Sequence, residues 1–151
     1  MATQEQAAPQ ASTTIPSAGG GSGGAPTTPE PQIGIEEIDA GLPAETLAGF
    51  LEALELSAGE AAPLFGVSPR TLKRYLKRER LDPRASDLLA RYLRLYEQAL
   101  GAFSAKERAV RWFKRPHVHF GHKTPLEMMR YDPGAEAVED LVGAIKHGVY
   151  Y

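Results

Sequence analysis

Apolar residues recur at helical spacing in the first structured part of the chain. In residues 43–54, PAETLAGFLEAL, apolar side chains stand three or four positions apart, at Leu47, Phe50, Leu51 and Leu54. This spacing predicts a helix with one buried face. The next residues, 57–80, contain two helix starts in close succession, and we expect the first helix to pack behind them.

Two short helices with a tight turn between them are predicted for residues 57–80. Ser57 and Glu60 form a Ser-x-x-Glu capping box, which marks the start of a helix that we expect to end at Phe65. Gly66 can adopt the left-handed conformation that ends a helix. The dipeptide at 68–69, Ser-Pro, supplies an N-cap and a first-turn proline for a second helix. The order of these signals is that of a helix-turn-helix.

The second of these helices has an apolar face and a cationic face. At 100° per residue the apolar side chains Leu72, Tyr75 and Leu76 share one side, and the opposite side and its flanks carry Arg70, Lys73, Arg74, Lys77 and Arg78. Such a helix enters the DNA major groove with its N-terminal residues on the base edges. We therefore expect Arg70, Thr71 and Arg74 to contact bases. Phosphates would be bound by Lys73, Lys77, Arg78 and Arg80. The N-cap Ser68 completes the set of residues assigned to DNA binding. The alternative is a solvated basic face on an ordinary helical hairpin.

A long helix is predicted after this hairpin, from the Asp-Pro at 82–83 to about residue 103. Its apolar stripe extends over about twenty residues, at Leu88, Leu89, Tyr92, Leu95, Tyr96, Ala99 and Phe103. We expect this helix to connect the DNA-binding half to the second half. Its two tyrosines are assigned to packing rather than to base stacking.

Three further helices are predicted in the second half. Ser104 and Glu107 indicate a capping box before a helix that contains Trp112. After a loop with the sequence HVHFGHK, Thr124 and Glu127 form another capping box. The last helix starts at the Asp-Pro of 132–133 and ends at a glycine. No stretch alternates long enough to form a strand, so the prediction is an all-α fold of about seven helices.

Composition divides the chain into a tail and a body. Residues 1–34 contain five prolines, six glycines and no basic residue, which predicts disorder. The expected division is a disordered tail at 1–40, a helix-turn-helix domain at 41–103 and a C-terminal domain at 104–151. The net charge of −2 hides a local excess, because residues 1–69 carry −9 and residues 70–94 carry +6. The positive charge is therefore concentrated where DNA contact is expected.

Several classes of protein are disfavoured by what the chain lacks. It contains no cysteine, which excludes disulfides and thiolate metal sites. The N-terminal stretch lacks the basic start and apolar core of a signal peptide. No segment approaches the roughly 18 apolar residues of a membrane helix. We expect a cytoplasmic protein that needs no cofactor.

The second half contains an ordered string of motifs: an Ala-x-x-Trp helix, a proline-led loop, a Gly-x-x-Thr-Pro-Leu-Glu turn and a last helix that ends in His-Gly before tyrosine. The residues of this string are Ala109, Trp112, Phe113, Pro116, Gly121, Thr124, Pro125, Leu126, Glu127, Val138, Leu141, His147, Gly148 and Tyr150. The string resembles the C-terminal toxin-binding domain of the Xre/MbcA/ParS antitoxins. The helix-turn-helix resembles the family's N-terminal half. The chain departs from the pattern at His117, where asparagine is usual, and at the His-Lys pair 122–123.

The resemblance implies a homodimeric antitoxin that neutralises a cognate toxin and represses its own operon by binding operator DNA. The toxin of this family is most often a RES-domain protein that consumes NAD. We place the toxin contact at the end of the last helix, where basic and aromatic groups suit a pocket shaped for NAD. The residues assigned to this contact are Lys146, His147, Gly148, Tyr150 and Tyr151.

Two other functions compete with this interpretation. The histidines His117, His119 and His122 have a spacing that suggests a metal enzyme, but no carboxylate lies inside their loop and the spacing is loose for zinc. The sequence contains neither a nucleophile with a partner base nor a phosphate-binding loop. We therefore expect no enzymatic activity and no bound metal. A stand-alone helix-turn-helix transcriptional regulator is the more serious alternative.

Overall fold

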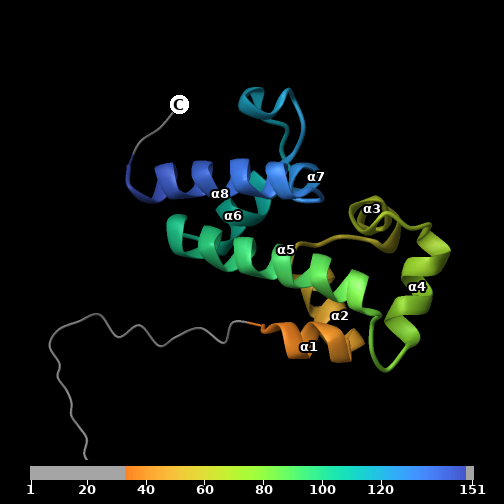
Figure 1. The fold of residues 1–151 in the computed structure, drawn as a ribbon. Helices are drawn as coiled ribbons and strands as arrows, with labels where there is room; N and C mark the ends of the chain where they lie inside the picture. The colour runs from red at the N-terminus through yellow and green to blue at the C-terminus, as the bar shows by residue number, and fades with distance from the viewer. Residues whose placement is uncertain (1–32, 149–151) are drawn as a thin grey trace, which may run out of the picture. The chain divides into compact units, whose positions relative to one another are not determined.

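The computed structural model describes residues 33–148, which belong to one compact unit. Within this range the chain forms eight α-helices, two 3-10 helices and no strand (Figure 1). The α-helices are α1 (Ile35–Ala40), α2 (Ala44–Ala53), α3 (Ala58–Ala61), α4 (Pro69–Lys77), α5 (Pro83–Ala102), α6 (Lys106–Phe113), α7 (Pro125–Met128) and α8 (Asp132–Lys146). The 3-10 helices are η2 (Ala62–Phe65) and η3 (Val118–Phe120). The predicted all-α fold is confirmed.

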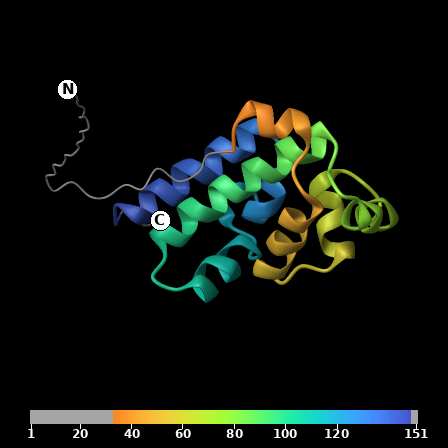
Figure 2. The same cartoon turned by 90° about the horizontal axis from the view of Figure 1, so that it is seen from below.

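The long helix α5 is the element on which the other helices pack. It begins at Asp82, whose carboxylate accepts a 2.8 Å hydrogen bond from the backbone N–H of Ala85. Its buried residues recur at helical spacing, as the sequence predicts. Helices α1, α6 and α8 all contact α5. Figures 1 and 2 show α5 and α8 side by side and running in the same direction, so that this pair joins the two halves of the fold.

Aromatic side chains make the core continuous between the halves. The ring of Tyr92 stacks on Phe50 of α2, with centroids 5.7 Å apart, and meets Phe65 edge-on at 5.4 Å. One turn further along α5, Tyr96 packs against Phe113 of α6, with centroids 6.0 Å apart. Both tyrosines are buried, which confirms their assignment to packing. The helix-turn-helix and the C-terminal lobe therefore share one hydrophobic core.

The helix-turn-helix forms where the sequence predicts it, with one difference in its first helix. Ser57 and Glu60 make the expected capping box, and the hydrogen bonds from Ser57 lower the pKa of the Glu60 carboxyl. The α-helix ends at Ala61 and continues as η2 to Phe65. Pro63 lacks the N–H that an α-helical bond would need, which accounts for the tighter last turn. Gly66 ends this segment with φ +67°.

Two further predictions need correction. The expected boundary of the tail at residue 40 is wrong, because α1 covers Ile35–Ala40, capped by a hydrogen bond between the Gly34 N–H and Glu37. The expected capping box at Ser104 is also wrong. Ala105 is the N-cap of α6 and makes no side-chain cap bond, and the Ser104 hydroxyl lies 3.3 Å from the Arg108 guanidinium instead. The capping box at Thr124 and the start of α8 at Asp132 are confirmed.

Some expectations fall on parts of the chain outside the described range. The predicted disorder concerns mainly residues 1–32, and the proposed toxin contact includes Tyr150 and Tyr151. Within residues 33–148, no helix is long and apolar enough to cross a membrane.

Candidate nucleic-acid and partner interfaces

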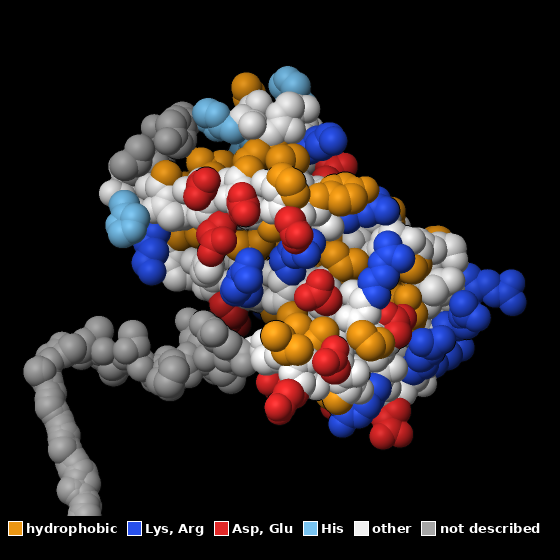
Figure 3. All heavy atoms as spheres, in the orientation of Figure 1, with side chains coloured by type: hydrophobic (Ala, Val, Ile, Leu, Met, Phe, Trp, Pro, Cys, Tyr) orange, Lys and Arg blue, Asp and Glu red, His pale blue; other side chains and the backbone are white. Residues whose placement is uncertain are grey.

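The cationic face of α4 is open to solvent. Leu72 and Tyr75 are buried against the core, which directs the other side of the helix outward. The side chains of Arg70, Lys73, Arg74, Lys77 and Arg78 are exposed, and Thr71 is half-buried. Figure 3 shows Lys and Arg side chains gathered over α4. The structure thus brings together on one helix the residues that the sequence assigns to DNA contact, except Ser68, Arg78 and Arg80, which lie just outside it.

Polar bonds hold the N-terminal end of α4 in a defined geometry. The Ser68 hydroxyl accepts a 3.1 Å bond from the Thr71 N–H and lies 3.1 Å from the Thr71 hydroxyl. The Arg74 guanidinium lies 3.4 Å from the same Thr71 hydroxyl. Three of the predicted DNA-contacting residues therefore form one cluster at the end of the helix that would face base edges.

Two of the predicted phosphate-binding residues have partners within the protein. The guanidinium of Arg78 lies over the ring of Tyr75, 5.5 Å from its centroid. Arg80 donates a 2.7 Å hydrogen bond to the backbone carbonyl of Gly41 and forms an isolated bridge with Pro43. The Arg80 contacts tie the segment after α4 to the connection between α1 and α2. The sequence pattern could not show this, because the partners are 39 residues apart.

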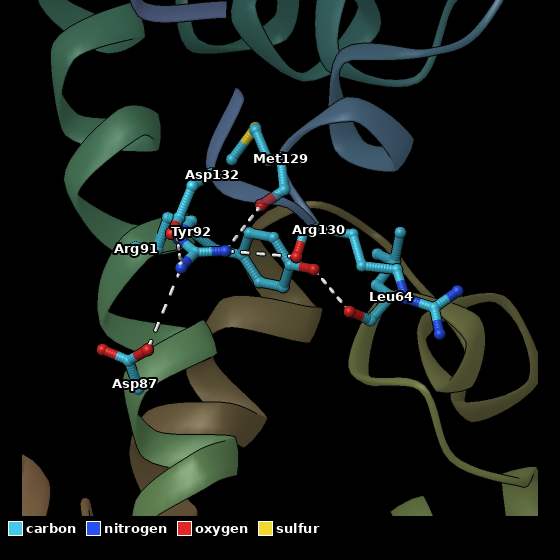
Figure 4. A network of polar contacts seen from close by, with 7 residues as sticks. All are labelled: Leu64, Asp87, Arg91, Tyr92, Met129, Arg130 and Asp132. Carbon is cyan, nitrogen blue, oxygen red and sulfur yellow. Dashed lines mark hydrogen bonds and ion pairs between the residues drawn. The ribbon is translucent and has the colours of Figure 1, made fainter. Parts of the chain in front are cut away.

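An arginine on α5 joins the helix-turn-helix half to the C-terminal lobe. The guanidinium of Arg91 donates to the backbone carbonyls of Met129, at 3.4 Å, and Arg130, at 3.1 Å (Figure 4). It also bonds the carboxylate of Asp132 at 2.5 Å and lies 3.9 Å from Asp87. Arg91 therefore fixes the junction between α7 and α8. Nothing in the local sequence pattern distinguishes Arg91 from a surface arginine.

A buried tyrosine on the next position of α5 contacts the helix-turn-helix itself. The hydroxyl of Tyr92 donates a hydrogen bond to the backbone carbonyl of Leu64, in η2 (Figure 4). Burial raises the pKa of Tyr92 well above its usual range, so the phenol keeps its proton. Consecutive residues of α5 thus hold the C-terminal junction and the first helical segment of the helix-turn-helix.

The predicted toxin contact lies partly at the exposed end of α8. Lys146, His147 and Gly148 are exposed there. Gly148 has φ +80°, and its N–H bonds the carbonyl of Ile145 at 3.1 Å, which ends the helix at the expected place. The other two residues of the set lie outside the described range.

The histidines of the loop before α7 do not converge on one point. His117 packs against Trp112, with ring centroids 5.3 Å apart, and bonds the Trp112 carbonyl at 3.2 Å. His122 has φ +67° and lies in the turn that the bridge between His117 and Lys123 closes. In residues 33–148 no group of three His, Cys, Asp or Glu side chains is placed to hold a metal ion.

Six residues of the C-terminal sequence motif are buried in the described part of the chain. They are Ala109, Trp112, Phe113, Pro125, Leu126 and Val138. Phe113 packs against Tyr96 of α5. This part of the motif therefore specifies the fold of the lobe.

Comparisons with known proteins find a matching domain family for each half of the fold. The antitoxin Xre-like helix-turn-helix domain family matches residues 34–94, and the antitoxin Xre/MbcA/ParS C-terminal toxin-binding domain family matches residues 98–148. Antitoxin Xre of Yersinia enterocolitica is 26% identical over 118 residues, which cover 77% of this chain and 80% of that protein. Antitoxin Xre of Photorhabdus laumondii is 27% identical over 114 residues, which cover 74% of this chain and 77% of that protein.

A solved structure shares the fold. It is the crystal structure of the M. tuberculosis MbcT–MbcA toxin–antitoxin complex, matched with a TM-score of 0.56 and 23% identity over 72% of this chain and 96% of that one. The two family matches together cover nearly all of the described helices, in the order that the fold shows. The chain therefore belongs to the Xre/MbcA/ParS family of antitoxins, with a helix-turn-helix domain followed by a toxin-binding domain.

Proposed function

We propose that this protein is a non-enzymatic, cytoplasmic antitoxin that neutralises a RES-domain, NAD-consuming toxin and represses its own operon. The observation that carries the proposal is the pairing of an exposed cationic α4 with a lobe that matches toxin-binding domains. The fold is shared with a chain from a toxin–antitoxin complex. The two activities are assigned to opposite ends of the molecule.

The DNA-binding half of the proposal rests on α4. Its exposed cations can neutralise phosphates and release counterions, which supplies affinity for any duplex. Arg70, Thr71 and Arg74 supply groups that can bond base edges, and the cap Ser68 holds the helix end that presents them. A helix of nine residues reads only one half-site. We therefore include a homodimer in the proposal, because a two-fold axis lets two copies of α4 bind successive turns of the duplex.

The toxin-binding half rests on the end of α8. Lys146 and His147 are exposed there and follow a helix that is fixed along its length by α5. A pocket for NAD accepts an anionic pyrophosphate and flat rings. A cation followed by two tyrosines can occupy such a pocket.

The proposal predicts that a RES-domain protein is encoded next to this chain, and the decisive experiment for the toxin half is co-expression with that protein. The full chain should restore growth, preserve cellular NAD and co-elute with the toxin. A variant without Tyr150 and Tyr151 should lose all three effects while it keeps its helical circular dichroism and its binding to DNA upstream of the operon. Removal of residues 1–32 is the control, and it should leave neutralisation intact. If the variant without the tyrosines still protects cells fully, the toxin contact lies elsewhere.

A stand-alone regulator remains the competing function, because the cationic α4 alone would suffice for it. The two proposals differ in their partner. A regulator of that kind would bind DNA with the same affinity in the presence of the toxin and would co-elute with no protein encoded beside it.

A further inference from the structure

A side chain from the C-terminal lobe lies against the turn of the helix-turn-helix. Arg130, at the junction of α7 and α8, is half-buried. A Cβ atom added to Gly66, the glycine between η2 and α4, would lie 3.0 Å from the Arg130 guanidinium. Gly66 is three residues ahead of the first residue of α4. A cationic side chain of the toxin-binding domain thus lies beside the turn that precedes α4, the proposed recognition helix.

The position of Arg130 is held by contacts on both sides. Its backbone carbonyl accepts the 3.1 Å bond from Arg91, and Figure 4 shows its side chain directed away from the Arg91 guanidinium. Its guanidinium lies over the ring of Tyr131, 5.3 Å from the centroid. Tyr131 is 61% exposed. The stacked ring limits the rotamers of Arg130, so less conformational entropy is lost when the guanidinium binds a ligand.

No salt bridge neutralises the charge of Arg130 in the described part of the chain. Among residues 33–148, no carboxylate lies within ion-pair distance of its guanidinium. The nearby Asp132 is bound by Arg91 instead. A guanidinium with this geometry favours phosphate, which it can bind through two parallel hydrogen bonds.

We propose that Arg130 binds a backbone phosphate of the operator, so that the C-terminal domain forms part of the DNA interface. The inference rests on the DNA-binding half of the proposed function. In a helix-turn-helix the first helix crosses the sugar-phosphate backbone while the second enters the groove. The Arg130 guanidinium lies beside Gly66, in the turn between these two helices. Arg91 is a positioning residue for this contact, because it fixes the backbone that carries Arg130.

The test is a salt titration of DNA binding with single variants of the full chain. Arg130→Ala and Arg130→Gln should weaken binding to operator and to random DNA alike, by roughly tenfold at moderate salt. The slope of log K against log salt should fall in magnitude by about 0.9, the value for one phosphate contact. Arg130→Lys should keep most of the slope, because it retains the charge. The Gln variant keeps a polar side chain without the charge, and it tests the charge if the Ala variant unfolds.

Two controls separate the possible outcomes. Arg108→Ala removes a positive charge from α6, which follows the end of α5 that is far from α4, and should leave the slope unchanged. Arg74→Ala tests the proposed recognition helix. If Arg74→Ala weakens operator binding and Arg130→Gln behaves like Arg108→Ala, the Arg130 contact is rejected and the proposed function stands. If neither Arg74→Ala nor Arg130→Gln changes DNA binding, the Arg130 contact and the DNA-binding half of the proposed function are both rejected. Loss of toxin binding with unchanged DNA binding would assign Arg130 to the toxin instead and overturn the inference.

Discussion

The hydroxyl of Tyr92 on α5 donates a hydrogen bond to the backbone carbonyl of Leu64 in η2. Both groups are buried, so neither can exchange the bond for one with water. Tyr92→Phe leaves the Leu64 carbonyl without its partner, and the cost of an unsatisfied buried acceptor is about 1–3 kcal/mol. We expect the free energy of unfolding to fall by that amount in urea titrations.

Tyr96 provides the matched control for this prediction. It lies four residues further along α5 and is 7% exposed, but its hydroxyl has no hydrogen-bond partner within residues 33–148. Tyr96→Phe should change stability by less than about 0.5 kcal/mol. Equal losses in the two variants would show that ring packing, and not the bond to Leu64, determines the effect.

The parts of the fold that the sequence predicted correctly are those with local signals. The caps at Ser57, Ser68, Asp82 and Thr124 each bond a backbone N–H three residues away, so their pattern is visible in the sequence. Helix α1 was missed because it is short and buries no residue, and Ile35 on it is 77% exposed. Its one signal was the Gly-x-x-Glu cap.

The missed features of the candidate site are those that depend on tertiary contact. Arg91 bonds carbonyls 38 and 39 residues away, and Arg130 meets Gly66 only because α8 packs on α5. Helical periodicity places residues on a face but says nothing of which distant loop covers that face. The false cap at Ser104 has a local origin instead, because α6 takes Ala105 as its N-cap and the Ser104 hydroxyl lies near the side chain of Arg108, four residues away.

The cap of α4 gives a second prediction. Ser68 accepts the N–H of Thr71, and Ser68→Ala should destabilise the protein by about 1 kcal/mol. The same variant should also weaken DNA binding, because the end of α4 that presents Thr71 and Arg74 loses its fixed geometry. Ser104→Ala is the control, since Ser104 caps no helix, and it should change stability by less than about 0.5 kcal/mol. Thermal unfolding and a DNA titration measure both effects.

The cationic face of α4 gives a third prediction, which separates base contact from phosphate contact. Arg74→Ala should weaken the operator complex by about 1–3 kcal/mol and relax its preference over random DNA. Lys77→Ala should weaken operator and random DNA alike and lower the salt slope by roughly one. Competition titrations at several salt concentrations distinguish these results. Equal losses on both DNAs for both variants would make α4 a non-specific basic surface.

Two glycines of α8 have opposite environments, which gives the last prediction. Gly134 is buried at the start of the helix, and a Cβ atom there would lie 1.9 Å from the backbone carbonyl oxygen of Met128 and 2.7 Å from its carbonyl carbon. Backbone atoms cannot rotate away as a flexible side chain can. Gly134→Ala therefore forces α8 away from the α7 junction that Arg91 holds, and overpacking of this kind costs about 1–3 kcal/mol.

Gly143 lies nine residues further along the same helix, and a Cβ atom there would meet nothing within 4 Å. Alanine in a helix interior is favoured over glycine by about 1 kcal/mol, because glycine loses more backbone entropy on folding. Gly143→Ala should therefore raise the melting temperature while Gly134→Ala lowers it. Since both substitutions add the same methyl group to the same helix, a loss of stability in both would mean that α8 tolerates no added volume along its length. Changes in melting temperature of opposite sign would locate the close approach of α8 to the rest of the fold at Met128, beside the carbonyls that Arg91 binds.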